Sequence, residues 1–368
     1  MLEQIAEAIK RQDYQTADQL LRKLKEEAAE NPWVQFYQAR LDEANGNLET
    51  AESLYKQVLR NTTSQKIISQ ARQGIQRLAQ IKEKQHQHEV NARVEKLAEV
   101  AMSEGSDELA VLVLEAIAPE AKQTAAQAFA RIMQIDAYTA RLQLPSRSWR
   151  LYRTGSLAEL KFYTSEMKKA EIPCFCVPIN SINQIQVYQA EYFESMTPQA
   201  TVICQNFQLQ QEIISFNFKE VTARVQGLLP LFEECVEVGV RGKLERKTKT
   251  LDYAQISDLH LPGKNLILRF GDRNYKFQQG IKFSSTIESK HNLKQTTREN
   301  WNKLNLFFQE KLPEVPVRSD FTAFAQTAID FSELLKRLSP NINLFRPEET
   351  PWDAAFQLYS TLVFLKET

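Results

Sequence analysis

The chain has 368 residues, of which 43% are hydrophobic and 25% are charged. Its 46 Lys and Arg residues balance its 46 Asp and Glu residues, so the net charge does not indicate direct binding to nucleic acid or to an anionic membrane. This length predicts two or three domains rather than a single core.

The sequence shows no pattern of secretion or membrane insertion. Residues 1–10 have an amphipathic helical pattern, not the basic and apolar regions of a signal peptide. No stretch approaches the roughly 18 consecutive apolar residues that a membrane span needs. The four cysteines are therefore expected to be reduced and buried. We expect a cytoplasmic protein that contacts no membrane.

The first part of the chain carries an internal repeat. Residues 12–17 align with residues 46–51, an offset of 34 residues, which is the tetratricopeptide (TPR) period. The small side chains of Ala17 and Ala51 allow the two helices of a hairpin to pack closely. Large apolar residues four and seven positions later fill the groove between the helices. The repeat therefore predicts TPR-like helical hairpins.

A third, degenerate copy of the repeat is predicted around Ala110 and Leu114, which reproduce the spacing of Ala51 and Tyr55. Further amphipathic helices are expected at 64–83 and 121–142. The polar run 84–89 is either a solvated continuation of the first of these helices or a linker. Residues 1–142 are thus assigned to the helical repeats.

After Pro145 the sequence alternates between strand-like and helix-like segments, which predicts a mixed α+β ligand-binding domain over residues 143–290. Ser156 and Glu159 form a capping box that begins a helix ending near residue 170. An amphipathic helix is expected at 217–235. Strands are expected at 149–153, 173–178, 184–193, 200–204, 266–270 and 275–277.

The last segment, residues 291–368, is predicted to be helical and to pack on the α+β domain. Thr296 and Glu299 form a second capping box, and further helices are expected at 321–338 and 352–365. The predicted fold class is therefore α+β multidomain, with N-terminal TPR-like α-hairpins, a central mixed α+β domain and C-terminal helices.

The segment 147–156 combines arginines with aromatic residues on a predicted strand that leads into a helix N-terminus. Guanidinium groups bind phosphate, aromatic rings stack on bases, and a helix N-terminus favours an anion. Strand alternation places Arg153 on the face of Trp149, opposite Tyr152. In the alternative interpretation, this is a solvated strand edge whose aromatic residues belong to the core. The candidate ligand-binding residues are Arg147, Trp149, Arg150, Tyr152 and Arg153.

A second basic cluster spans residues 241–249, where five cations accompany one carboxylate. Arg241, Lys243 and Arg246 are candidates to close a phosphate site together with the first cluster. The alternative is an exposed hairpin whose charges discourage aggregation.

Signals for catalysis and metal binding are weak. Cys174 and Cys176 would share a strand face, but their spacing matches no common zinc site, and buried structural thiols are the simpler interpretation. His260 has no recognisable nucleophile or acid partner, and the chain contains no phosphate-binding loop or nucleophile elbow. We expect no enzyme activity, cofactor or metal.

Taken together, several segments resemble a known family. The repeats at Ala17 and Ala51, the segment 148–155 and the C-terminal segments 348–353 and 356–359 are similar to those of cyanobacterial TPR-containing proteins. Within that group the chain resembles the cyanobacterial cyclic di-GMP receptors that act through a transcriptional regulator. The resemblance implies a cyclic dinucleotide ligand and a regulatory protein, such as a transcription factor, as partner.

The sequence thus predicts a signalling adaptor or receptor that binds a phosphate-bearing nucleotide, plausibly cyclic di-GMP, and a protein partner, without binding nucleic acid directly. The alternative is a TPR scaffold that binds proteins independently of any ligand.

Overall fold

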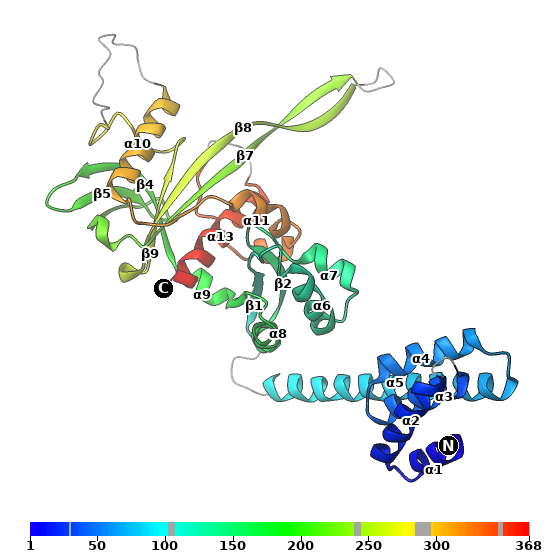
Figure 1. Cartoon of the computed structure of the whole chain (residues 1–368). Coiled ribbons are helices and arrows are strands. Elements are labelled where there is room, and N and C mark those ends of the chain that lie inside the picture. Colours follow the sequence, from blue (N-terminus) through cyan, green and yellow to red (C-terminus); the bar gives the residue numbers. More distant parts are fainter. Residues whose placement is uncertain (29–30, 102–106, 239–243, 284–295, 345–348, 368) are drawn as a thin grey trace. The chain divides into compact units, whose positions relative to one another are not determined.

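The computed structural model describes residues 1–28, 31–101, 107–238, 244–283, 296–344 and 349–367. The protein is an α+β multidomain chain with two compact units. We call Met1–Ala98 unit 1 and Glu99–Thr368 unit 2. Figure 1 labels the helices and strands of both.

Unit 1 consists of helices that pack in sequential pairs. Ala17 and Ala51 are fully buried where neighbouring helices meet, as the repeat pattern predicts. The polar run 84–89 continues the last helix of the unit. The helices are α1 (Leu2–Lys10), α2 (Tyr14–Ala28), α3 (Pro32–Ala44), α4 (Leu48–Asn61) and α5 (Gln65–Ala101).

A buried tyrosine links three helices of unit 1. The hydroxyl of Tyr55 in α4 donates to Oε2 of Glu43 in α3 at 2.6 Å, and Nε of Arg77 in α5 donates to Oε1 of the same carboxylate at 2.8 Å. Gly74 leaves room for the Tyr55 ring, because a Cβ there would lie 2.5 Å from it. This close approach explains a glycine in the middle of a helix.

The predicted third repeat is wrong. Residues around Ala110 form strand β1 (Leu109–Leu114), which pairs with a strand on each side. Its residues are nearly all buried, as expected of a central strand covered on both faces, and such a continuous apolar run does not distinguish a strand from a buried helix. The boundary between the compact units therefore lies at residue 98 rather than at 142.

Strand β1 is the centre of a three-stranded antiparallel sheet, with β2 (Arg150–Ser156) and β3 (Cys174–Pro178) at its edges. One face is covered by α6 (Lys122–Met133), α7 (Ala137–Gln143) and α8 (Leu157–Lys169). The single helix predicted at 121–142 is divided, because Gln134 adopts a left-handed conformation with φ 55° and Asp136 caps α7.

A seven-stranded sheet has the order β10-β7-β8-β9-β4-β5-β6. The helix predicted at 217–235 is wrong, because this segment forms most of β7, whose alternate residues face two different helical layers. The strand predicted at 275–277 is also wrong, because those residues lie in turns after β9. The strands are β4 (Gln186–Ser195), β5 (Ala200–Gln205), β6 (Gln211–Phe216), β7 (Ala223–Val238), β8 (Leu244–Leu261), β9 (Leu266–Gly271) and β10 (Val317–Arg318).

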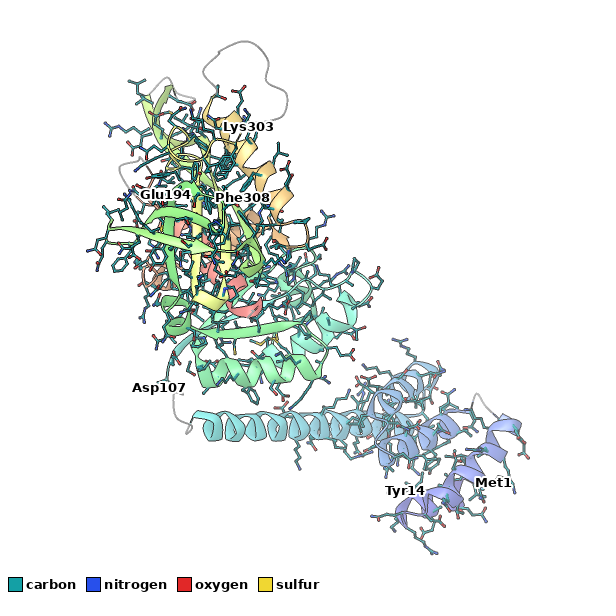
Figure 2. The ribbon with its side chains drawn as sticks, turned by 90° about the vertical axis from the view of Figure 1, so that its left-hand side faces the viewer. Met1, Tyr14, Asp107, Glu194, Lys303 and Phe308 are labelled. Carbon is teal, nitrogen blue, oxygen red and sulfur yellow. The ribbon has the colours of Figure 1, made fainter. Side chains whose placement is uncertain are left out.

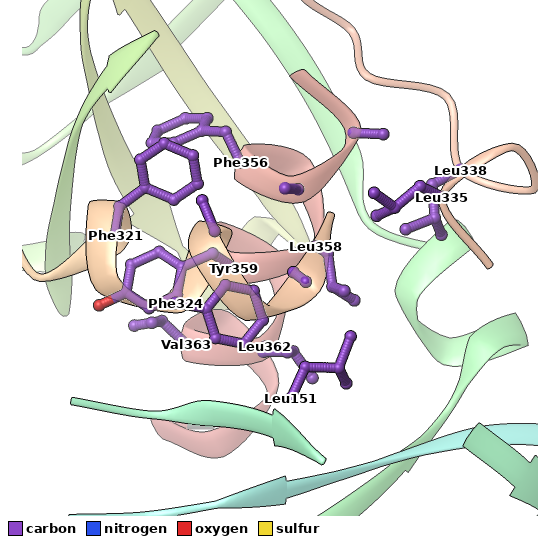
Figure 3. Packing of buried hydrophobic residues seen from close by; sticks show 14 of the residues in the cluster. Leu151, Phe321, Phe324, Leu335, Leu338, Phe356, Leu358, Tyr359, Leu362 and Val363 are labelled. Carbon is purple, nitrogen blue, oxygen red and sulfur yellow. The ribbon is translucent and has the colours of Figure 1, made fainter. Parts of the chain in front are cut away.

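The helix α13 (Pro351–Glu367) lies between the two sheets and is buried from Asp353 to Phe364. Figure 3 shows its residues Phe356, Tyr359 and Leu362 against α11 (Phe321–Ala328) and near β2. The short α9 (Ile179–Asn183) and α12 (Ser332–Leu335) join this layer. From the predicted C-terminal helical segment, α11, α12 and α13 thus provide a central layer of unit 2, rather than only packing on its outside.

The opposite face of the seven-stranded sheet is covered by α10 (Thr297–Lys311), which Figure 2 labels at Lys303 and Phe308. Both predicted helix starts are in place. Thr296 and Glu299 form the full capping box of α10, whereas at α8 Ser156 caps the helix but the Glu159 carboxylate pairs with Arg153 instead of closing the box. The outer parts of β7 and β8 extend beyond the helices as a two-stranded ribbon (Figure 1). Unit 2 is therefore layered as helix, sheet, helix, sheet and helix, with a projecting ribbon.

Candidate functional site

The aromatic residue at the start of the arginine-rich strand belongs to the core. Trp149 is 7% exposed, and its ring packs edge-on against Phe175 at 4.9 Å and Tyr359 at 6.0 Å between centroids. The ring faces the layer that contains α13. These contacts support the alternative interpretation, in which Trp149 belongs to the core and does not bind a ligand.

Tyr152 and Arg153 both contact the helices on the other face of the sheet. The Tyr152 ring packs on Phe129 of α6 at 5.1 Å, and burial raises its pKa. Arg153 forms an ion pair of 3.0 Å with Glu159 and lies 5.3 Å above the Tyr163 ring. Strand alternation predicted that Tyr152 and Arg153 would lie on opposite faces of the sheet. This prediction is wrong, because the pairing of β1 with β2 contains a β-bulge at this point.

Arg147 and Arg150 remain the accessible cations of this strand. Arg147 is exposed in the bend before β2, and Nη1 of Arg150 donates to the carbonyl oxygen of Leu142 at 3.2 Å. The following helix N-terminus is already capped by Ser156, whose Oγ accepts from the backbone N–H of Glu159 at 3.3 Å. The Glu159 carboxylate at this first turn disfavours a further anion.

The second predicted cluster does not join the first. Arg246 is exposed on β8 opposite Val236, in the ribbon that projects away from the three-stranded sheet (Figure 1). Arg241 and Lys243 lie outside the described residues. Of the eight residues predicted to bind the ligand, the structure therefore brings together only those of the first strand, and most of these have internal partners.

A cavity of about 250 Å³ opens where α10 and α11 flank β7. Strand β10 pairs with β7 at Arg224 and Val225, and none of the described strands covers the edge of β7 beyond them, where the cavity begins. We call this cavity the amide pocket. Its lining is rich in amide and hydroxyl groups and consists of Gln226, Gly227, Leu228, Gln255, Ile256, Trp301, Asn305, Ser319 and Thr322.

A buried arginine lies beside the amide pocket without a counter-ion. Arg224 is 1% exposed, and its Nη2 donates to Oδ1 of Asn305, a pocket residue, at 3.3 Å. Its Nε has no hydrogen-bond partner, and no ion pair to it is found among the described residues. Burial lowers its pKa, but an arginine side chain stays protonated in proteins. An unpaired buried charge is costly, so an anion bound here would be strongly favoured.

Two neighbours extend this polar site. Nε2 of Gln226 also donates to Oδ1 of Asn305, at 3.1 Å. Ser257 pairs with Gln226 across the ladder, and its buried Oγ has no partner in the described structure. Arg224, Gln226 and Ser257 thus present hydrogen-bonding groups on one face of β7 and β8, beneath α10.

Sequence reasoning missed this site because it placed Arg224 on a predicted helix. The only signal was a single arginine between the apolar residues Ala223 and Val225. A charge in such a run is notable only if the segment is a buried strand.

A second buried polar group lies between α13 and the seven-stranded sheet. Nε and Nη2 of Arg269 donate to the two oxygens of Asp258 at 2.9 and 2.8 Å. The Ser360 hydroxyl donates to Asp258 at 2.6 Å and lies 3.0 Å from Nε2 of His260. These four residues resemble a catalytic set in composition, but all are fully buried, so a substrate cannot reach them. Their position indicates a structural role, joining α13 to β8 and β9.

This network predicts a pH dependence. Burial lowers the pKa of His260 to about 4, with Asp258 opposing and Arg269 supporting the shift. The unfolded chain binds a proton on this histidine below about pH 6.5, whereas the native state does not until about pH 4. Stability is therefore expected to fall by about 2 kcal/mol from pH 7 to pH 5 through this group.

The check is a series of urea unfolding curves between pH 7 and pH 5 for the wild-type protein and His260→Gln. The variant cannot titrate at this position, so its loss of stability over the window should be smaller by about 2 kcal/mol. Equal losses in the two proteins would show that the histidine does not titrate as described.

The cysteines form no metal site in the part of the chain that is described, where no group of three or more potential ligands comes together. Cys174 and Cys204 lie in different sheets, and burial raises the pKa of each thiol to about 12. Both thiols are therefore protonated and poor metal ligands.

Searches for similar proteins found no matching family model, no matching curated protein and no matching solved structure. Among the described residues, none of the helices combines the length and apolar character required to cross a bilayer.

Proposed function

We propose that the protein is a cytoplasmic signalling adaptor. In this proposal unit 2 binds a phosphate-bearing nucleotide, with cyclic di-GMP as the first candidate, and the helical hairpins of unit 1 bind a regulatory protein such as a transcription factor. The observation that carries the proposal is the uncompensated guanidinium of Arg224 beside the amide pocket.

The chemistry of the pocket suits such a ligand. A guanidinium group forms short, charge-assisted hydrogen bonds to phosphate. The amides of Gln226 and Gln255 offer both donors and acceptors, as the edge of a nucleobase requires. The Asn305 amide is held in place by Arg224, Gln226 and the Trp301 carbonyl oxygen. A cavity of about 250 Å³ accommodates one nucleotide half, so the second half of a cyclic dinucleotide would extend outside it along β7.

Titration calorimetry with cyclic di-GMP, GMP and inorganic phosphate tests the proposal. Arg224→Met keeps an unbranched, flexible side chain and removes its charge. We expect at least about tenfold weaker nucleotide binding, because a charged hydrogen bond is worth about 1.5–3 kcal/mol. The same variant should be as stable as the wild type or more so, by about 1 kcal/mol, because it no longer buries an unpaired charge.

The matched control is the double variant Arg147→Ala/Arg150→Ala, which removes the accessible cations of the predicted strand. It should bind as the wild type does. If this control loses affinity and Arg224→Met does not, the nucleotide binds at the strand. Absence of heat with every nucleotide would refute nucleotide binding altogether.

The alternative function is a scaffold that binds proteins without a ligand. It is favoured by the internal contacts of Trp149, Tyr152 and Arg153, which leave little of the predicted strand available to a ligand. Affinity capture of one regulatory partner with equal yield in the presence and absence of nucleotide would support it.

A further inference from the structure

The projecting ribbon of unit 2 has one apolar face and one charged face. Beyond the pair of Leu231 and Asp252, β7 and β8 pair only with each other as far as Val238 and Leu244. Seven residues of β7 and eight of β8, which has one extra residue at a β-bulge, therefore extend about 23 Å past the last helical layer. An isolated two-stranded hairpin is only marginally stable in water, so a partner surface is expected to cover it.

Register determines which side chains share a face. Leu228, Phe232 and Val236 alternate along β7 and therefore point the same way. Positions 230 and 238 of β7 fall on the same face, and their cross-strand pairing with Tyr253 and Leu244 places these two residues of β8 there as well. These five side chains are 42–73% exposed. We call this surface the apolar ribbon face.

The opposite face is polar. It carries Glu233, Glu237 and Lys249, and Lys249 and Glu237 form an ion pair across the two strands. This face thus carries charged groups directed to solvent, two of which pair with each other. Only the apolar ribbon face has the composition of an interface core.

We propose that the apolar ribbon face packs against the same face of a second copy of the chain. The charge pattern of the face fits such a contact. The face carries one acid, Glu234, and one base, Arg246, and neither forms an ion pair with any described residue. An isologous contact requires a surface that is complementary to itself. If the two ribbons pack antiparallel, with the twofold axis passing through the cross-strand pair that contains Cys235, the pair before it in one copy lies over the pair after it in the other. Glu234 of one copy then lies at the same height along the ribbon as Arg246 of the other.

The area of the apolar ribbon face also fits such a contact. The five exposed apolar side chains present about 500 Å². Interfaces are about 60% non-polar, so with its polar rim the face would bury about 800 Å² per copy. This is the size of a standard stable interface. The near-zero charge of the face also disfavours nucleic acid or an anionic membrane as the occupant.

Sedimentation velocity on the full chain at about 1 to 100 µM tests the proposal. The wild-type protein should become dimeric within this range, and Phe232→Glu/Val236→Glu should remain monomeric. Both positions are exposed, so circular dichroism should show an unchanged fold. The control Glu233→Lys alters charge on the polar face and should dimerise as the wild type does.

Charge exchange tests the antiparallel arrangement. Glu234→Arg and Arg246→Glu should each weaken the dimer, and the double variant should restore it. A wild-type protein that stays monomeric at about 100 µM overturns the proposal, as does a Phe232→Glu/Val236→Glu variant that still dimerises. A double variant no tighter than the single ones, or a monomer that sediments with phospholipid vesicles, also overturns it.

Discussion

Replacing Asp258 with alanine is expected to lower the free energy of unfolding of unit 2 by about 3–5 kcal/mol. The substitution leaves the guanidinium of Arg269 fully buried without its counter-ion. It also removes the acceptor of the Ser360 hydroxyl on α13. The remaining acceptors of Arg269 are neutral. They are Oε1 of Gln357 at 2.9 Å and the carbonyl oxygens of Pro340 at 2.7 Å and Asn341 at 3.3 Å.

The double variant Asp258→Leu/Arg269→Met is the control, because it removes both charges and fills the space with apolar atoms. It should recover most of the loss, since a buried ion pair is rarely worth more than a well-packed apolar pair. Urea unfolding followed by tryptophan fluorescence measures both variants. In a Trp33→Phe background the remaining tryptophans, at 149, 301 and 352, all report on unit 2. A double variant no more stable than Asp258→Ala would contradict this account of the charges.

Phe356→Ala is expected to destabilise unit 2 by about 3–5 kcal/mol, because it opens a cavity in the layer between the two sheets. The Phe356 ring is fully buried and packs edge-on against Phe321 at 5.0 Å between centroids. It also lies over the backbone of β7 at Gly227, where a Cβ would be 2.4 Å from the ring.

This contact provides a double-mutant cycle. Gly227→Ala alone should cost about 1–3 kcal/mol by overpacking. In the Phe356→Ala background the added methyl group enters vacated space, so the cost of Gly227→Ala should fall by about 1–2 kcal/mol. The same fluorescence-detected unfolding gives all four free energies. Strict additivity would mean that the ring and the strand do not touch in solution.

Local sequence signals predicted the helix starts well. The side-chain oxygens of Ser156 and Thr296 each accept a hydrogen bond from a backbone N–H group only three residues later. These caps can therefore be recognised without knowledge of any distant part of the chain. The repeat at Ala17 and Ala51 was equally readable, because each small residue faces a neighbouring helix of the same unit.

The errors arose where distant contacts decide the structure. The segments around Ala110 and Val225 are apolar enough for either a helix or a strand, and only their neighbours in the sheets select the strand. The site was missed for the same reason. Arg224 is notable because Asn305 and Phe308, some 80 residues later, bury it without supplying a charge.

The position of α13 in the chain determines when unit 2 can complete its fold during translation. Every strand that the structure describes precedes this helix in the chain, yet it is the layer on which both sheets of unit 2 pack. A nascent chain that has not yet emerged past residue 364 therefore has two sheets with uncovered apolar faces. Unit 1 does not depend on a distant segment in this way, because its helices pack on helices that are near them in the sequence. During translation, unit 2 is thus the part of the protein that most needs protection by chaperones.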